Sequence, residues 1–350
     1  AANDGLLIDY AYNGSSGNFD LSLGLKDVSL YTDGALLADT TNGSWFDRSL
    51  KVNGLDLVIA GETGGQTAVP DDWVYKVAQT VNLLIDPYGD GIDAAAQNQL
   101  IKILSGEAGT WHAGSPTAQR IANGEGSYYF PNPLSNPESY PGYEAWLDVN
   151  MQDDMVWYHD PDERNITAEE QVNEVVEHLM HTIHIFGVRG AVDGSYDALM
   201  GRDIEVESGQ AYKKQELYLA MREAMDNGVF NPDYRQAPDN VLLKEYTFLL
   251  NYNMWELGKA FWDDDNGDGL GSLAPEWSDA ARSPDAILEK NPLGYSLFET
   301  YFDPVLSKPD VEVLRKIFSD GTAGASVYSV GSVVLPGMQE FLLNVQIEII

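Results

Sequence analysis

The hydrophobic pattern of the chain changes near residue 67, and this change limits the folds that are open to it. Before that point, short segments such as LKVNGLDLVIAG alternate apolar with polar residues and are separated by NG, DG and SSG turn signals, a pattern typical of β-strands. Beyond Pro70, segments such as DDWVYKVAQTVNLLI place their apolar residues at helical intervals. The sequence therefore predicts an α+β fold, with a small β-rich part over residues 1–66 followed by a mainly α-helical body over residues 67–350.

The helical body is expected to contain one long irregular stretch. Residues 107–142 are rich in Gly, Pro, Ser and Asn, so they are predicted to form loops, and YEAWLDV directly after them is predicted to form a strand. Apolar periodicity and end signals predict helices over 71–85, 93–106, about 168–186, 209–228, 239–262 and 309–321.

The charge of the chain excludes several kinds of partner. Its 55 Asp and Glu residues against 20 Lys and Arg residues give a formal net charge of −35, which repels phosphate backbones and anionic lipids and attracts divalent cations. We therefore expect no nucleic-acid partner, and no apolar stretch reaches the length of about 20 residues that a membrane span needs. The absence of cysteine excludes disulfides and thiolate zinc sites. These features favour an extracellular or cell-surface protein that gains rigidity from bound cations.

One segment, EVVEHLMHTIH at 174–184, holds three of the five histidines of the chain. Thr167 and Glu170 form a T-x-x-E capping box, and Gly187 stands where a C-terminal glycine belongs, so the segment is predicted to be helical. One face of this helix is apolar and consists of Val175, Val176, Leu179, Met180, Ile183 and Phe186. The opposite strip consists of Glu174, Glu177, His178, His181 and His184.

Such a strip has the composition of a metal site. Side chains three or four residues apart on a helix lie about 5–6 Å apart at Cβ, close enough to hold one ion. His181 has helical spacing to the other two histidines and to Glu177, so it is the expected central ligand, with Glu177, His178 and His184 as the other candidate ligands on this helix. Imidazole combined with carboxylate favours zinc, iron, manganese or copper over calcium. The alternative is a solvated polar helix face without chemistry.

The stretch VVEHLMHTI resembles the catalytic helix of zincin metallopeptidases, especially lethal-factor-like domains, in which an apolar pair precedes H-E-x-x-H. Here the first two motif residues are exchanged, so that Glu177 precedes His178, with His181 in register. The resemblance implies a zincin-like body in which Glu177 and His181 are metal ligands and His178 occupies the position of the catalytic base. In the inverse register, Glu174, Glu177 and His178 match H-x-x-E-H with glutamate for the first histidine.

Zincins of this type take their third ligand from a glutamate on a later helix, and the resemblance extends in outline over residues 71–260. KEYTFLLNYNMWE offers Glu245 and Glu256, and Glu245 is the better candidate because its apolar neighbours indicate a buried helix. The alternative role of Glu245 is a salt bridge with Lys244. The whole chain also resembles acidic secreted proteins of marine bacteria, cyanobacteria among them, a likeness that implies no activity.

Two acidic loops are typical of calcium sites. Residues 263–276, DDDNGDGLGSLAPE, begin like an EF-hand loop, in which alternate oxygens surround Ca²⁺ and a glycine makes the turn. Residues 86–97, DPYGDGIDAAAQ, precede a predicted helix, and an acidic turn with Asp93 as helix cap is their alternative. The candidate calcium ligands are Asp86, Asp90 and Asp93 in residues 86–97, and Asp264, Asn266, Asp268 and Glu276 in residues 263–276.

Two functions fit these features. The first is a secreted, calcium-stabilised metalloenzyme, a metal-dependent hydrolase such as a peptidase, in which Glu177 or His178 takes the proton of an attacking water. The second is a non-catalytic surface-layer or matrix protein that its bound cations hold together. The concentration of histidines favours the first function, and the exchanged motif favours the second.

Overall fold

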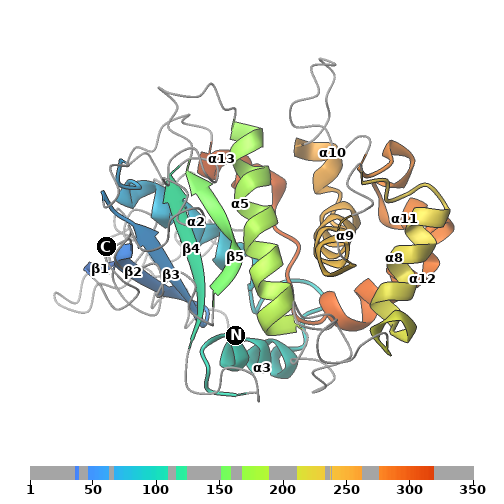
Figure 1. Ribbon diagram of the computed structural model, residues 1–350, viewed down its shortest axis with the longest axis horizontal. Helices are drawn as coiled ribbons and strands as arrows, with labels where there is room; N and C mark the ends of the chain where they lie inside the picture. Colours follow the sequence, from blue (N-terminus) through green and yellow to red (C-terminus); the bar gives the residue numbers. More distant parts are fainter. Residues whose placement is uncertain are drawn as a thin grey trace, which may run out of the picture.

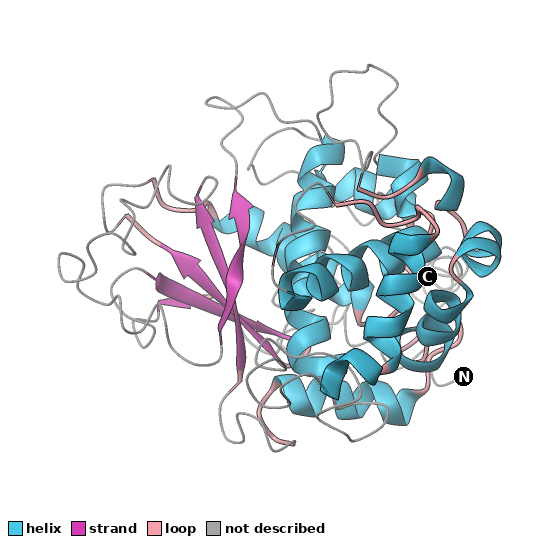
Figure 2. Ribbon diagram, turned by 45° about the vertical axis from the view of Figure 1, so that its right-hand side comes forward, coloured by secondary structure: helices cyan, strands magenta, loops and turns pink. Residues whose placement is uncertain are grey.

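The structure is a computed structural model, and it describes residues 36–38, 46–62, 67–108, 116–123, 151–158, 168–188, 211–232, 237, 239–261 and 276–318. This part of the chain has a five-stranded sheet on one side and most of its helices on the other (Figure 1, Figure 2). The predicted α+β class is confirmed in this form.

The strands of the sheet follow one another in space in the order of the chain. They are β1 (Leu37–Ala38), β2 (Phe46–Val52), β3 (Leu55–Ala60), β4 (Thr117–Asn123) and β5 (Met151–Tyr158). The pairs β1–β2 and β2–β3 are antiparallel, and the pairs β3–β4 and β4–β5 are parallel.

A two-residue turn joins β2 to β3. Asn53 and Gly54 both have positive φ angles, 46° and 82°, as a type I′ turn requires, and an Asn-Gly pair adopts these angles readily. The turn packs against α3 (Ala94–Leu104) so closely that a Cβ atom on Gly54 would overlap the carbonyl oxygen of Ile101. The NG signal in the sequence therefore marks the turn that sets the register of this hairpin.

The sheet continues across residue 66, where the sequence predicts the end of the β-rich part. β3 pairs with β4, and Leu57 lies opposite Gln119 in that pair. The connection between these two strands contains α2 (Asp71–Leu84) and α3. Buried apolar residues on both sides of residue 66 form one cluster, which includes Phe46 and Phe318. Strands from both sides of the expected boundary thus share one sheet and one core.

The prediction of loops throughout residues 107–142 is wrong at β4. Its sequence, TAQRIAN, has little apolar alternation, and it is a strand because β3 and β5 pair with it on either side. The predicted strand YEAWLDV and residues 1–35 lie outside the described residues.

Helices make up most of the rest of the described chain. The α-helices are α2, α3, α5 (Ala168–Ile183), α8 (Glu216–Asp226), α9 (Asp239–Met254), α10 (Leu257–Phe261), α11 (Pro284–Lys290), α12 (Pro292–Leu297) and α13 (Val311–Phe318). Short π- or 3₁₀-helical segments are η4 (His184–Val188), η5 (Ala211–Lys214), η6 (Asp279–Ala281) and η7 (Phe298–Phe302). The predicted helix over 239–262 is divided at Glu256, whose φ of 60° separates α9 from α10. Among the described residues, no helix has the length and apolar character needed to cross a membrane.

α5 connects the sheet to the helical part. It packs against β5, and its apolar face is completely buried (Figure 1). This face consists of Val172, Val175, Val176, Leu179, Met180 and Ile183, each 0% exposed. On the same helix, the buried hydroxyl of Thr182 donates a hydrogen bond to Gln119 of β4. α5 ends at Ile183 instead of near residue 186, because the chain continues as the π-helix η4.

α9 is buried on almost every side. It contacts α5, α8, α10, α11 and η7, and residues on different faces of it, among them Tyr246, Leu250 and Asn253, are 0% exposed. Figure 1 shows α9 nearly end-on beside α5, so the two helices cross. This crossing places α9 over the polar strip of α5.

Candidate metal site

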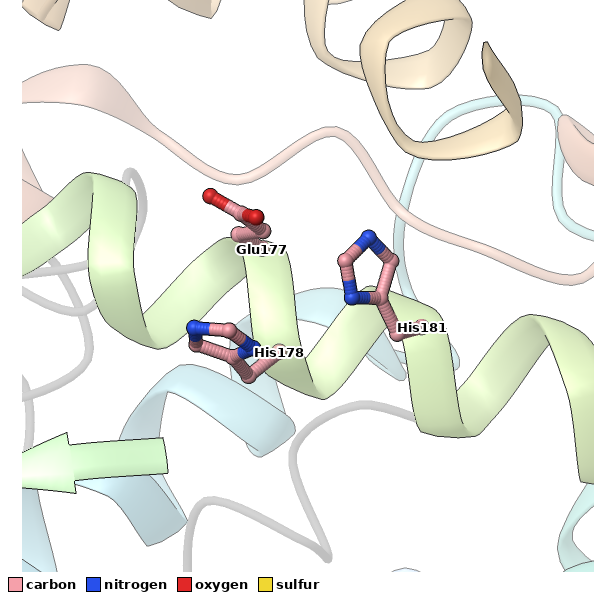
Figure 3. Close-up of side chains that lie close together, drawn as sticks. All are labelled: Glu177, His178 and His181. Carbon is pink, nitrogen blue, oxygen red and sulfur yellow. The ribbon is translucent and has the colours of Figure 1, made fainter. Parts of the chain in front are cut away.

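The centre of the candidate metal site is a single turn of α5. Ligand atoms of Glu177, His178 and His181 all lie within 4.8 Å of one another. Figure 3 shows Glu177 and His181 projecting from the same side of the helix, with His178 on the adjoining side, as their sequence spacing requires. In the described part of the chain, no other group of three or more His, Asp or Glu residues comes together in this way.

A second helix supplies a carboxylate to the same place. Oε2 of Glu245, on α9, lies 3.2 Å from Nε2 of His181. The other candidate, Glu256, lies instead 2.9 Å from the ammonium group of Lys259 and 3.8 Å from that of Lys308. The structure thus brings Glu245, and not Glu256, to the histidine helix.

The polar strip of α5 is covered by protein. The side chain of His181 is 1% exposed, and those of His178 and Glu245 are 12% and 16% exposed. The ring of Phe248, one turn beyond Glu245 on α9, packs edge-on against His181, with 5.6 Å between the ring centroids. A solvated helix face would leave these groups in water, so that alternative does not describe the centre of the strip.

Negative charge gathers at this crossing. Desolvation raises the pKa of Glu177 to about 7, although its side chain keeps some exposure. The charges of His178 and His181 oppose this increase, and the charges of Glu245 and Glu174 add to it. Lys244 is the cation beside this group, with its Nζ 3.5 Å from Oε1 of Glu245. A bound cation would relieve the repulsion between these carboxylates.

A carboxylate also contacts the ring of His178. Nε2 of His178 lies 2.9 Å from Oε1 of Glu174, one turn earlier on α5. The rings of His178 and His181 meet nearly edge to face, with centroids 5.7 Å apart. A carboxylate next to an imidazole fixes the orientation of the ring and raises its basicity. The i,i+4 spacing of Glu174 and His178 is the sequence signal for this pair.

His184 belongs to the strip but lies outside the group formed by Glu177, His178 and His181. It is the first residue of η4, is 5% exposed and packs against Phe302, with 5.0 Å between the ring centroids. Neither of its ring nitrogens has a hydrogen-bond partner among the described residues. Burial, followed by the charge of His181, lowers the pKa of His184 well below its ordinary value. His184 is therefore a neutral core histidine in this structure, and its predicted role as a ligand has no support from the geometry.

The first predicted calcium loop, residues 86–97, contains a turn and a helix cap. Oδ1 of Asp86 accepts a hydrogen bond of 2.9 Å from the backbone N–H of Tyr88, and Oδ1 of Asp93 accepts one of 2.9 Å from that of Ala95. The described residues bring no three carboxylates together in this loop. Its geometry corresponds to the acidic-turn alternative, and calcium binding at Asp86, Asp90 and Asp93 stays a prediction.

The second predicted calcium loop cannot be compared with the structure over most of its length. Residues 263–275, with Asp264, Asn266 and Asp268, lie outside the described residues. Only Glu276 is described, and its carbonyl oxygen accepts a hydrogen bond of 2.7 Å from the backbone N–H of Asn231. Calcium binding here also stays a prediction.

The donor atoms at the crossing of α5 and α9 fit a transition metal ion. Two atoms bound about 2.0–2.2 Å from one tetrahedral zinc ion lie roughly 3.3–3.6 Å apart, and the separation of 3.2 Å between His181 and Glu245 is close to that range. Mixed imidazole and carboxylate ligands suit zinc, iron and manganese. Glu177, His178 and His181 could thus hold a metal ion together. Glu245 contacts His181 but does not belong to the group whose ligand atoms all lie within 4.8 Å of one another.

Comparison of the chain with family models, with curated proteins and with solved structures finds no match. The function of this protein is therefore inferred from the geometry of the site.

Proposed function

We propose that this protein is a secreted metalloprotein whose site between α5 and α9 holds a transition metal ion, and that it acts as a zincin-like, metal-dependent hydrolase, most simply a peptidase. One observation carries the proposal: Nε2 of His181 and Oε2 of Glu245, from two crossing helices, lie 3.2 Å apart beside Glu177 and His178. This set contains a residue for each position that the zincin resemblance requires.

Each residue of the site has a role in this proposal. Glu177, His181 and Glu245 are the ligands, so the set contains one imidazole and two carboxylates. When bound, the metal ion would lower the pKa of a water molecule and polarise a substrate carbonyl. His178, next to the ligands, takes the proton of the attacking water. Glu174, 2.9 Å from the His178 ring, orients the imidazole and stabilises its charged form.

A digestion experiment tests the hydrolase. The purified protein is loaded with Zn²⁺ or Mn²⁺ and incubated with a mixed peptide library, and cleavage is followed by mass spectrometry. We expect cleavage that a chelator abolishes. The His178→Gln variant should keep its metal and lose about 10²–10⁴-fold in rate, the usual contribution of a general base. The His181→Ala variant should lose the metal itself.

The exchange of Glu177 and His178 relative to the zincin motif favours a second candidate, a non-catalytic extracellular matrix or surface-layer protein with a structural metal. The same experiment separates the two functions. A protein that binds the metal in full but cleaves no peptide in the library supports the structural role. A protein that binds no metal contradicts both.

We include calcium binding in the proposal because of the acidic loops, and secretion because a net charge of −35 keeps a protein soluble in salty water. In a secreted protein without cysteine, bound calcium would supply the rigidity that disulfides otherwise give. Calcium should raise the melting temperature of the chelator-treated protein. Asp90→Asn and Asp264→Asn, one in each loop, should each reduce that increase. A melting temperature that does not respond to calcium contradicts the stabilising role.

A further inference from the structure

A buried hydrogen bond links α5 to α9 close to the metal site. The hydroxyl of Tyr252, on α9, donates to Oδ1 of Asn173, on α5. The amide nitrogen of Asn173 in turn donates a hydrogen bond of 3.1 Å to the carbonyl oxygen of Phe261, the last residue of α10. Tyr252 and Asn173 are 1% and 4% exposed. These two bonds therefore connect three helices in the interior.

The hydrogen bond between Tyr252 and Asn173 lies on the same faces of α5 and α9 as the proposed metal ligands. On α5, Asn173, Glu177 and His181 follow one another at intervals of four residues and so lie on one side of the helix. On α9, Tyr252 lies seven residues, about two turns, beyond Glu245 and so shares its face. α9 thus touches this side of α5 at two points, and Glu177 lies midway between them.

Ring packing joins the two points along α9. The rings of Tyr252 and Phe248 have centroids 5.2 Å apart, and those of Phe248 and His181 are 5.6 Å apart. Burial, and then the charge of Glu177, raise the pKa of the Tyr252 hydroxyl well above its ordinary value. The hydroxyl is therefore a hydrogen-bond donor, and Asn173 is its acceptor.

We propose that Tyr252 and Asn173 are positioning residues of the metal site, because their hydrogen bond holds α9 at the angle to α5 that places Glu245 opposite Glu177 and His181. The other helices that pack on α9 hold it in place as a whole, but a polar contact at one point of α5 alone would leave its exact angle to α5 less well fixed. The second contact, roughly 12 Å away along α5, fixes that angle. The inference rests on the proposed metal site but not on any catalytic activity.

Tyr252→Phe tests this role, because it keeps the packed ring and removes only the hydroxyl. We expect the affinity for Zn²⁺, measured by competition with a chromophoric chelator, to fall at least tenfold, within the range found for residues that support metal ligands from outside the coordination shell. The absorption bands of the Co²⁺-loaded variant should also change, since they report ligand geometry. Asn173→Leu breaks the same bond from α5, together with the bond to Phe261, and should lower the affinity at least as much.

Tyr246→Phe is the matched control. Tyr246 is on the same helix, is 0% exposed, and donates a hydrogen bond of 2.7 Å to Asn291, away from the site. The Tyr246→Phe variant should lower the melting temperature about as much as Tyr252→Phe does. Its Zn²⁺ affinity should stay within about twofold of the native value. The inference would be overturned if Tyr252→Phe and Asn173→Leu bound Zn²⁺ as tightly as the native protein. It would also be overturned if Tyr246→Phe lost as much Zn²⁺ affinity as they do. A native protein that binds no Zn²⁺ would instead refute the proposed function.

Discussion

Three histidines on one strip of α5 and η4 meet three different environments. His181 lies between two helices with a carboxylate 3.2 Å away, His178 pairs with a carboxylate of its own helix, and His184 packs against an aromatic ring. These neighbours decide what each imidazole can do. The first can bind a cation, the second can accept a proton, and the third is held neutral by burial.

His184 should make the metal-free protein sensitive to acid. Its folded-state pKa is lowered, so below an unfolded-state pKa of about 6.5 the unfolded chain binds a proton that the folded chain does not, and stability falls as pH falls. His184→Leu removes this linkage. Between pH 7 and pH 5.5 in the presence of a chelator, the native protein should lose about 1 kcal/mol more unfolding free energy than the variant. Urea denaturation at the two pH values measures the difference, and parallel losses would contradict the assignment of His184 as a neutral core residue.

At the scale of elements, the fold depends on close approaches between segments far apart in the sequence. The turn between β2 and β3 contacts α3, and α9 crosses α5. The first of these contacts holds the hairpin against the helical connection that leads to β4. The second assembles the candidate site.

Gly54→Ala should destabilise the protein strongly. The residue has a φ of 82°, and the added methyl group would overlap the carbonyl oxygen of Ile101. Gly228→Ala is the control, because Gly228 has a similar φ of 67° and its Cβ would meet no heavy atom within 4 Å in the described part of the structure. The control should lose about 1 kcal/mol from backbone strain, and Gly54→Ala should lose at least twice that in chemical denaturation. Equal losses would show that the turn does not pack against α3 as described.

The sequence predicts these elements to different degrees, for physical reasons. Local signals suffice for the hairpin, where Asn53 and Gly54 provide the turn, and for α5, where the apolar face has helical periodicity. They do not suffice for β4, which is a strand because of its two neighbours, nor for the change to a π-helix at His184. The spacing of His181 and Glu177 points to a site on α5, but its burial depends on α9, which packing and not local pattern brings there. Tyr252 could have been found by its spacing of seven residues from Glu245.

At the scale of the whole molecule, the described residues form one core, built from strands on both sides of residue 66 and from the helices. β1, β2 and β3 precede this point and β4 and β5 follow it, yet all belong to one sheet. In the part of the chain that the structure describes, the buried apolar residues from Phe46 to Phe318 form a single cluster. The β-rich segment is therefore part of the support for α5 and its site.

A fragment that contains only residues 67–350 should not fold. It would lack β3, one of the two partners of β4, and the buried side chains of β2 and β3, among them Leu50, Val52 and Leu57. Thermal unfolding followed by circular dichroism should show no cooperative transition for the fragment. The full chain cleaved within residues 63–66 is the control, and it should keep its two pieces together. A cooperative transition of the isolated fragment would show that the two parts are separable.

The central claim is that Glu245 and His181 close a metal site between two helices, and the Zn²⁺ stoichiometry and affinity of a glutamate pair test it most directly. Glu245→Gln removes the carboxylate that lies 3.2 Å from His181. Glu256→Gln, eleven residues further along the chain, removes a carboxylate that pairs with Lys259 and Lys308 instead. The native protein and Glu256→Gln should each bind one ion per chain with equal affinity, and Glu245→Gln should bind at least tenfold more weakly. No stoichiometric binding by the native protein, or equal binding by the two variants, would contradict the account.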